Sequence, residues 1–246
     1  MADAPPFRSG FSDVDASGAG NQLIDYLDAA RRAPGIVRAK SWSFDVLALE
    51  PGMGALDVGC GTGEDVIAMA DLAQPKGCAV GVDVSATMID EARRRHGHRP
   101  DVSFQTADAG LLPFESATFD ACRCERTLQH IDDPDAAVAE MARVLRPGGR
   151  LALLEPDWGT LVVSGGDPEV TKRILAVHVG RHKQPALGRR LHCLLTTHGF
   201  TDIEMGAGVV MYTDISSAYR AFGMVRAAEL ALRFPIKRPS DGTRIS

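Results

Sequence analysis

The stretch LDVGCGTG, residues 56–63, decides the fold that we predict for this chain of 246 residues. Residues 55–58 form a short apolar run typical of a buried strand, and the glycines that follow mark a tight turn into a helix. In an open α/β sheet, ligands bind outside the carboxyl ends of the strands, where glycines let the backbone approach them closely. Glycines also serve such turns for packing alone, so the stretch predicts a strand, a turn, a helix and a candidate ligand loop.

Short apolar runs alternate with helical patterns beyond this loop. Strands are predicted at residues 55–58, 79–82, 102–106, 119–124 and 150–154, and helices at 64–73, 86–95 and 135–145. Strands that alternate with helices are typical of a parallel, doubly wound sheet. The sequence therefore predicts a Rossmann-like α/β fold.

Two further apolar runs, residues 201–205 and 209–213, are separated only by Gly206-Ala207-Gly208. So short a connection joins only antiparallel strands. We therefore expect a C-terminal antiparallel hairpin that completes a seven-stranded, mostly parallel sheet. Helical patterns are predicted at 17–32 and 36–49 before the sheet, and at 168–181, 187–197 and 216–232 after its fifth strand.

The composition narrows the class of partner. The formal net charge is −5 and no dense run of Lys and Arg occurs, so nucleic acid is not the expected substrate. No segment approaches the roughly 18 unbroken apolar residues that span a membrane. The five cysteines include no CxxC pair, which favours reduced thiols and a cytoplasmic location.

Asp83 narrows the class of ligand. It ends the second predicted strand, 20 residues after Gly63, a spacing that suits a carboxylate on the two ribose hydroxyls. A nucleoside triphosphate loop needs a Gly-Lys pair, and the chain has none. The dinucleotide fingerprint needs its third glycine at position 64, where Glu64 would face a pyrophosphate.

With Asp57 in front, the pattern GxGxG resembles the first motif of the class I S-adenosylmethionine-dependent methyltransferases. S-adenosylmethionine carries a sulfonium and an ammonium but no phosphate, so nearby carboxylates favour it. The resemblance implies that Asp57 receives the methionine ammonium, directly or through water. It also implies that the backbone of residues 59–63 lines the methionyl chain and the ribose.

Further motifs follow in the order of this family. Residues 107–109 (ADA) and 112–114 (LPF) are similar to its adenine motif, and residues 145–150 (LRPGGR) to its turn into the fifth strand. The resemblance covers residues 50–158 and implies that Asp108 accepts from the adenine amino group beside the Ala109 amide. The implied cofactor residues are Asp57, Gly59, Cys60, Gly61, Thr62, Gly63, Asp83, Val84, Met88, Ala107, Asp108, Ala109, Glu125, Arg126 and Gln129.

A narrower resemblance concerns the methyl acceptor. Residues 125–131 (ERTLQHI) and 155–158 (EPDW) are similar to ubiquinone/menaquinone-type small-molecule methyltransferases, especially those that modify bacterial natural products. Methyltransferases of adenine and glutamine amino groups carry an Asn/Asp-Pro-Pro-aromatic signature after the fourth strand. This chain has Cys124-Glu125-Arg126-Thr127 there, which argues against that chemistry.

His130 is the candidate general base, because histidine titrates near neutral pH and the residue follows the fourth strand at the mouth of the site. The alternative is a helix-terminal histidine that bonds to the backbone. His178 and His182 share one helix face, but Val179 stands where a zinc protease has glutamate, so we expect no metal there. The predicted acceptor-side residues are Glu155, Asp157, Trp158, His178 and His182, although Trp158 is equally compatible with the core.

These patterns predict a single domain over residues 1–246. Its parts are an N-terminal arm with helices (1–50), the cofactor core (51–158), an acceptor-side helical cap (159–199), and the C-terminal hairpin and helix (200–246). The expected function is S-adenosylmethionine-dependent methyl transfer to a small, aromatic or polyketide-like acceptor, by a monomer or homodimer. An NAD-type oxidoreductase and a non-catalytic module that keeps the cofactor pocket are the alternatives.

Overall fold

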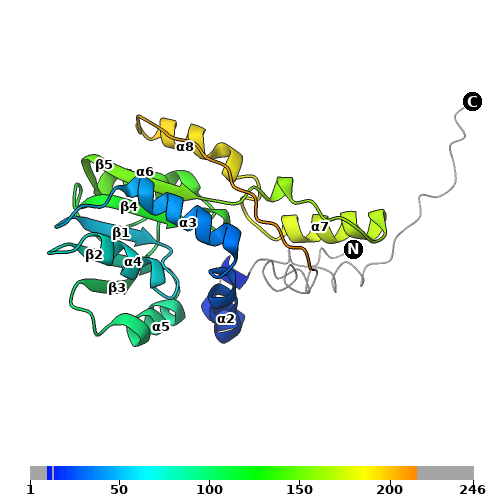
Figure 1. The fold of residues 1–246 in the computed structure, drawn as a ribbon, viewed down its shortest axis with the longest axis horizontal. Coiled ribbons are helices and arrows are strands. Elements are labelled where there is room, and N and C mark those ends of the chain that lie inside the picture. The colour runs from blue at the N-terminus through cyan, green and yellow to red at the C-terminus, as the bar shows by residue number, and fades with distance from the viewer. Residues whose placement is uncertain (1–9, 13, 215–246) are drawn as a thin grey trace, which may run out of the picture.

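The computed structural model describes residues 10–12 and 14–214, and its centre is one parallel sheet (Figure 1). The strands are β1 (Gly54–Val58), β2 (Cys78–Asp83), β3 (Val102–Thr106), β4 (Phe119–Glu125) and β5 (Leu145–Leu154), in the order β3-β2-β1-β4-β5. Each neighbouring pair is parallel. The chain order reverses between β1 and β4, so the carboxyl ends of these two strands flank the switch point where such sheets bind ligands.

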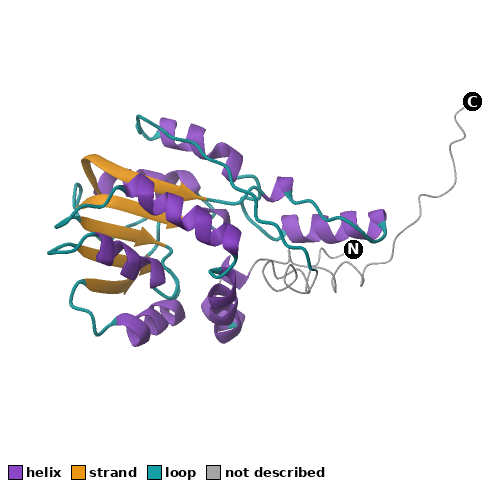
Figure 2. Ribbon diagram, in the orientation of Figure 1, coloured by secondary structure: helices purple, strands orange, loops and turns teal. Residues whose placement is uncertain are grey.

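Helices cover both faces of the sheet (Figure 2). On one face lie α3 (Pro34–Leu47), α4 (Glu64–Leu72) and α5 (Ala86–His96), and on the other lie α6 (Pro134–Val144) and α8 (Leu191–Thr197). Successive strand residues point to opposite faces, so Ala55 joins the core under α4 and Leu56 joins the core under α6. The helices and strands predicted around the sheet are confirmed.

The remaining elements lie toward the carboxyl ends of the strands (Figure 1). They are η1 (Gly10–Ser12), α1 (Val14–Ser17), α2 (Gly20–Ala30), η2 (Leu128–His130), η3 (Trp158–Thr160), α7 (Pro168–Gly180) and η4 (Gly188–Arg190). Asp133 and Asp167 cap α6 and α7, because each carboxylate accepts from first-turn amides. No helix within residues 10–12 and 14–214 is both long and apolar enough to cross a membrane.

Charged contacts fix the amino-terminal helices against the sheet. Asp15 of α1 accepts a 2.7 Å hydrogen bond from the Ser85 hydroxyl at the start of α5. Asp28 of α2 pairs with Arg95 of α5 at 2.9 Å. These contacts place α1 and α2 beside the carboxyl ends of β1 and β2.

The prediction of a C-terminal antiparallel hairpin is wrong. Residues 201–214 form no strand; they cross in front of α3 as an extended segment, orange in Figure 1. Gly206 serves a close approach instead of a turn, since a Cβ on it would lie 3.0 Å from the Trp42 ring. Val209 and Met211 are 76% and 78% exposed, so these apolar residues do not form a buried sheet face.

The sheet of the described residues therefore has five strands instead of the predicted seven. The helix predicted at 216–232 and the tail after it lie outside the described residues.

Candidate active site

One large cavity lies at the carboxyl ends of β1, β4 and β5, under α2 and α3. Its volume is about 2080 Å³, whereas single small-molecule pockets measure roughly 300–1,000 Å³. The predicted residues that line it are Asp57, Gly59, Cys60, Gly61, Thr62, Glu125, Arg126, Gln129, His130, Glu155, Asp157, Trp158 and His182. The cavity thus joins the predicted cofactor loop to the predicted acceptor side and has room for two ligands.

The glycine loop holds its shape through β2. The amides of Gly59 and Cys60 both donate to the Val82 carbonyl, at 2.8 and 2.9 Å. Gly59 has a φ of +76°, and a Cβ there would lie 2.0 Å from the Thr127 hydroxyl oxygen. Only glycine fits this position, because both the left-handed backbone and the contact exclude a side chain.

Asp83 braces the same loop. One carboxylate oxygen accepts from the Gly61 amide at 3.0 Å and the other from the Ser85 amide at 2.9 Å. Burial raises the pKa of Asp83, and these backbone hydrogen bonds oppose the rise. A carboxylate has about four acceptor positions, so capacity remains for hydroxyl donors.

The predicted adenine residues lie apart from the cavity. Asp108 accepts from the Gly110 amide at 2.8 Å, Ala109 and Met88 are buried, and Val84 is exposed. Gly63, Asp83, Val84, Met88, Ala107, Asp108, Ala109 and His178 are not among its lining residues. An adenine subsite at these positions stays a prediction.

A buried arginine stands at the centre of the cofactor side. Arg123 lies opposite Asp57 in the pairing of β4 with β1, and its side chain is 1% exposed. Its guanidinium contacts Asp57 at 3.4 Å, Asp65 at 2.9 Å and the Ser43 hydroxyl at 3.0 Å, and it also pairs with Glu125. The arginine thus joins three carboxylates from β1, α4 and β4.

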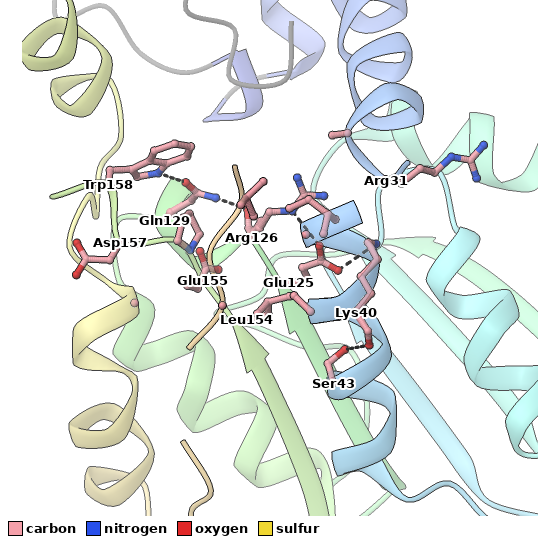
Figure 3. Close-up of a pocket in the computed structure, with 18 of the residues that line it drawn as sticks. Arg31, Lys40, Ser43, Glu125, Arg126, Gln129, Leu154, Glu155, Asp157 and Trp158 are labelled. Atoms are coloured by element: carbon pink, nitrogen blue, oxygen red, sulfur yellow. Dashed lines mark hydrogen bonds and ion pairs between the residues drawn. The ribbon is translucent and has the colours of Figure 1, made fainter. Parts of the chain in front are cut away.

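Lys40 of α3 adds a second cation to these charges, and Figure 3 shows its side chain reaching from α3 to Glu125. Its ammonium lies 3.0 Å from Glu125 and also pairs with Asp65. Arg126 donates to the other oxygen of Glu125 at 2.9 Å. The charge cluster therefore comprises Lys40, Asp57, Asp65, Arg123, Glu125 and Arg126.

The two acids that line the cavity titrate differently. Burial raises the pKa of Asp57 to about 7; Arg123 and Lys40 oppose the rise, while Asp65 and Glu125 add to it. Burial also disfavours ionised Glu125, but Arg126, Arg123 and Lys40 outweigh it and hold the pKa of Glu125 well below its ordinary value. Glu125 is therefore ionised at neutral pH, whereas Asp57 is near its midpoint.

Sequence reasoning missed Arg123, Lys40 and Asp65. The available signal was a charged residue between Cys122 and Cys124, in the middle of a predicted strand. Lys40 and Asp65 gave no such signal, because single charges on amphipathic helices usually face solvent.

Aromatic rings form the wall on the acceptor side. Trp158 stacks on His182 with ring centroids 4.5 Å apart, His130 lies 5.8 Å from His182, and Phe11 lies 5.7 Å from His130. The Trp158 indole donates to the Gln129 side-chain oxygen at 2.6 Å. Trp158 is half-buried and faces the cavity, so it does not belong to the core alone.

The imidazoles of this wall are neutral at pH 7. Burial, followed by neighbouring positive charges, lowers the pKa of His130 to about 3, that of His178 to about 3 and that of His182 to about 4. The His130 Nδ1 atom is buried without a hydrogen-bond partner among the described residues. No backbone hydrogen bond is therefore described for this nitrogen, and the choice between a general base and a histidine that bonds to the backbone stays a prediction.

The spacing of His178 and His182 has a packing role. His182 Nδ1 contacts the His178 carbonyl at 3.1 Å, and the Trp158 ring meets His178 edge-on at 4.8 Å. His178 is fully buried behind the wall. No group of three or more potential metal ligands occurs in residues 10–12 and 14–214.

Glu155 and Asp157 support neighbouring turns. Asp157 forms a bidentate pair with Arg189, at 2.5 and 2.8 Å. Glu155 accepts from the Leu128 amide at 2.7 Å, and burial raises its pKa to about 8, so its carboxyl is protonated at neutral pH. Both residues line the cavity, but their described contacts hold η2 and η3 in place.

Residues 55–149 match the family described as the methyltransferase domain. This part of the chain, which holds the glycine loop and strands β1 to β4, is therefore similar to a methyltransferase domain. The chain is 36% identical over 119 residues to the ubiquinone/menaquinone biosynthesis C-methyltransferase UbiE of Hahella chejuensis, and the match covers 47% of this chain and 48% of UbiE.

Two other comparisons extend beyond the residues that match the methyltransferase domain. An uncharacterized 37.1 kDa protein in transposon TN4556 of Streptomyces fradiae is 36% identical over 211 residues, covering 85% of this chain and 61% of that protein. The chain thus spans less than two thirds of the length of either relative. The solved YcgJ protein of Bacillus subtilis shares the fold, with a TM-score of 0.59, 21% identity and coverage of 80% and 82%.

The charges around the cavity fit S-adenosylmethionine better than they fit a dinucleotide. Glu64, at the start of α4, pairs with Arg95 at 2.5 Å and accepts from the Thr62 hydroxyl at 2.5 Å. This places a carboxylate where a pyrophosphate would need helix amides free of negative charge. Asp57 and Glu125 on the cavity wall suit the cationic groups of S-adenosylmethionine.

Proposed function

We propose that the chain transfers a methyl group from S-adenosylmethionine to a small, uncharged acceptor that carries an aromatic or conjugated ring, such as a polyketide-like secondary metabolite. One observation carries the proposal: a single cavity runs from Asp57 and the glycine loop to the wall of Trp158, His182 and His130. A methyl transferase needs both partners side by side. The volume of about 2080 Å³ accommodates them.

The wall supports the choice of acceptor. Trp158, His182 and Phe11 offer ring faces and edges, which bind aromatic groups through offset and edge-on contacts. The neutral imidazoles attract neither anions nor cations strongly, but they accept and donate hydrogen bonds. An uncharged ring with a hydroxyl or carbonyl matches this chemistry.

The residues of the chain act mainly by placing the two reactants. When bound, S-adenosylmethionine supplies a methyl group on a positively charged sulfur, which is already activated for displacement. On our proposal, Asp57 binds the ammonium and Asp83 orients the ribose. Trp158 and His182 hold the acceptor ring, and such positioning alone contributes several kcal/mol, up to about 7–11 in well-oriented systems.

His130 is the proposed proton acceptor for a hydroxyl of the acceptor. Its imidazole is neutral at pH 7, and a neutral imidazole has one ring nitrogen that accepts a hydrogen bond. A pKa of about 3 makes the ring a weak base, since proton transfer is most effective near the working pH. We therefore assign His130 a hydrogen bond that orients the nucleophile and accepts its proton as the new bond forms.

Ligand binding followed by an acceptor screen tests the proposal. Isothermal titration with S-adenosylhomocysteine and NADH identifies the cofactor class, and incubation with S-adenosylmethionine and a panel of phenolic and polyketide acceptors is read by mass spectrometry. The expected result is S-adenosylhomocysteine binding and an acceptor heavier by one methyl substitution. NADH binding alone would indicate an oxidoreductase, and cofactor binding without turnover on any acceptor would indicate a non-catalytic module.

A further inference from the structure

Arg123 is the one cationic residue of β4, whose two acidic residues, Asp120 and Glu125, lie toward its ends. It follows Cys122 and precedes Cys124, both buried in the core on the opposite face of the sheet. Its own side chain points toward α3 and α4, where the guanidinium lies 4.9 Å above the Phe44 ring and contacts Asp57 on the neighbouring strand. β4 thus places one buried cation against the carboxyl group of Asp57, just before the glycine loop.

Stability alone does not account for a buried arginine here. Removing a guanidinium and a carboxylate from water costs several kcal/mol per ion, and well-packed apolar residues often replace a buried ion pair without loss. The surrounding core residues, among them Ala55, Ala121 and Ala152, are apolar and would accept such a replacement. The contact with Asp57, at the wall of the cofactor cavity, gives the charge a functional location.

Asp57 faces more negative than positive charge without Arg123. Glu125 of β4 and Asp65 of α4 face it as acids, and Lys40 of α3 faces it as the other cation. The nearby thiols Cys60 and Cys122 have raised pKa values because they are buried, so they carry no charge. Lys40 itself lies against Asp65 and Glu125, which leaves Arg123 as the described cation in contact with Asp57.

We propose that Arg123 is the positioning residue of the cofactor site: it favours the ionised form of Asp57 and fixes the direction of its carboxylate toward the ammonium of the cofactor. This inference rests on the proposed function. Arg123 is itself among the residues that line the cavity, but its side chain is 1% exposed and its guanidinium is paired with Asp57, Asp65 and Glu125. It acts through Asp57, which lines the cavity.

The inference gives a pH dependence with a definite sign. Asp57 titrates near pH 7 even with Arg123 in place, and a carboxyl group binds an ammonium well only when ionised. Loss of the arginine charge raises the pKa of Asp57 further, so less of the protein is competent at neutral pH. Affinity then falls most at acidic and neutral pH and recovers as the pH rises.

Isothermal titration of S-adenosylhomocysteine into the wild-type chain, Arg123→Met and Arg123→Lys tests this, across about pH 6 to about pH 9. Comparison at each pH cancels the titration of the ligand itself. We expect Arg123→Met to bind about fivefold or more weakly at pH 7, because a rise of about one pKa unit from about 7 lowers the ionised fraction of Asp57 about fivefold at that pH. The loss should shrink toward the alkaline end, and Arg123→Lys should restore most of the affinity.

Two further variants separate positioning from general damage. In an Asp57→Asn background, Arg123→Met should have little additional effect, because the residue through which it acts is gone. Asp65→Asn removes a like charge beside Asp57 and should shift the pH dependence in the opposite direction, strengthening binding at acidic pH. This variant keeps the test informative even if Arg123→Met does not fold.

Three results would overturn the inference: an unchanged affinity and pH profile in folded Arg123→Met, an equal loss in the Asp57→Asn background, or no shift in Asp65→Asn. The outcome is distinguishable from failure of the proposed function. A wild-type chain that binds no S-adenosylhomocysteine rejects the function, whereas equal binding by wild type and Arg123→Met rejects only the role of Arg123.

Discussion

Trp158 stacks on His182 with ring centroids 4.5 Å apart and ring planes inclined by 20°. The two residues come from separate segments after β5, one at the start of η3 and one just beyond α7. The hydrogen bond from Trp158 to Gln129 adds a third segment, the turn after β4. The stacked pair and its hydrogen bond to Gln129 thus fix the acceptor wall relative to the carboxyl end of β4, next to the charge cluster.

Trp158→Ala should weaken the binding of the acceptor without weakening the binding of the cofactor. Aromatic pairs contribute about 0.5–1.5 kcal/mol beyond the burial of their area, so we expect the KM for a ring-bearing acceptor to rise about two- to tenfold or more. The affinity for S-adenosylhomocysteine should stay the same. Trp158→Phe is the matched control and should retain most of the affinity for the acceptor. An equal loss of affinity for both ligands in Trp158→Ala would contradict a separate acceptor wall.

Asp83→Ala should weaken S-adenosylhomocysteine binding by about 1–3 kcal/mol, the scale for losing a buried or charged hydrogen-bond partner. The carboxylate also braces Gly61 and Ser85, so thermal unfolding must be measured beside the titration. Asp83→Asn keeps the shape of the side chain and part of its hydrogen-bonding capacity, so its affinity for S-adenosylhomocysteine should lie between those of the wild type and Asp83→Ala. Unchanged affinity in a folded Asp83→Ala variant would remove Asp83 from the cofactor site.

His130→Ala should lower kcat for a hydroxyl acceptor far more than it lowers cofactor affinity. General base contributions are typically about 10²- to 10⁴-fold, and the low pKa of His130 places the expected loss toward the lower end. His130→Asn, which keeps a hydrogen-bond acceptor, should retain part of the rate. A kcat that does not change in either variant would leave the imidazole without a role in the reaction.

Glu155 gives the chain a pH-dependent stability with a definite sign. Its folded-state pKa is raised to about 8, so the folded chain binds a proton that the unfolded chain releases above its ordinary pKa of about 4.3. Glu155 therefore costs stability progressively as the pH rises from about 4 to 8. Glu155→Gln should show a Tm advantage over wild type that is small at acidic pH and grows toward pH 8 in thermal unfolding; an advantage that is constant with pH would contradict the buried, protonated carboxyl.

The position of residues 201–214 can be tested with two glycines. Gly206→Ala places a Cβ 3.0 Å from the Trp42 ring, whereas Gly208→Ala meets nothing within 4 Å. We expect Gly206→Ala to destabilise the chain by up to about 1–3 kcal/mol and to change the tryptophan emission, while Gly208→Ala does neither. Identical behaviour of the two variants would mean that this segment does not lie on α3.

The sheet was predictable because its strands and helices alternate with clear periods. The hairpin was not, since the Gly206-Ala207-Gly208 spacing suits a tight turn and a close approach to Trp42 equally well. Only the contact between segments more than 160 residues apart, Trp42 and Gly206, separates the two. Local sequence contains no such information.

The site was predictable where the ligand dictates the residues, as in the loop from Asp57 to Gly63. It was not predictable where one protein group serves another. Arg123 is explained by Asp57, Asp65 and Glu125, and these four residues meet only in the folded chain. The same holds for Lys40, which reaches the charge cluster from a helix before the sheet.

Titration of S-adenosylhomocysteine into the chain and its Asp57→Asn variant tests the central claim most directly. The account predicts saturable binding at one site per chain in the wild type and clearly weaker binding in Asp57→Asn, with no measurable affinity for NADH in either. Absence of S-adenosylhomocysteine binding together with binding of NADH, or equal binding by the two chains, would contradict it.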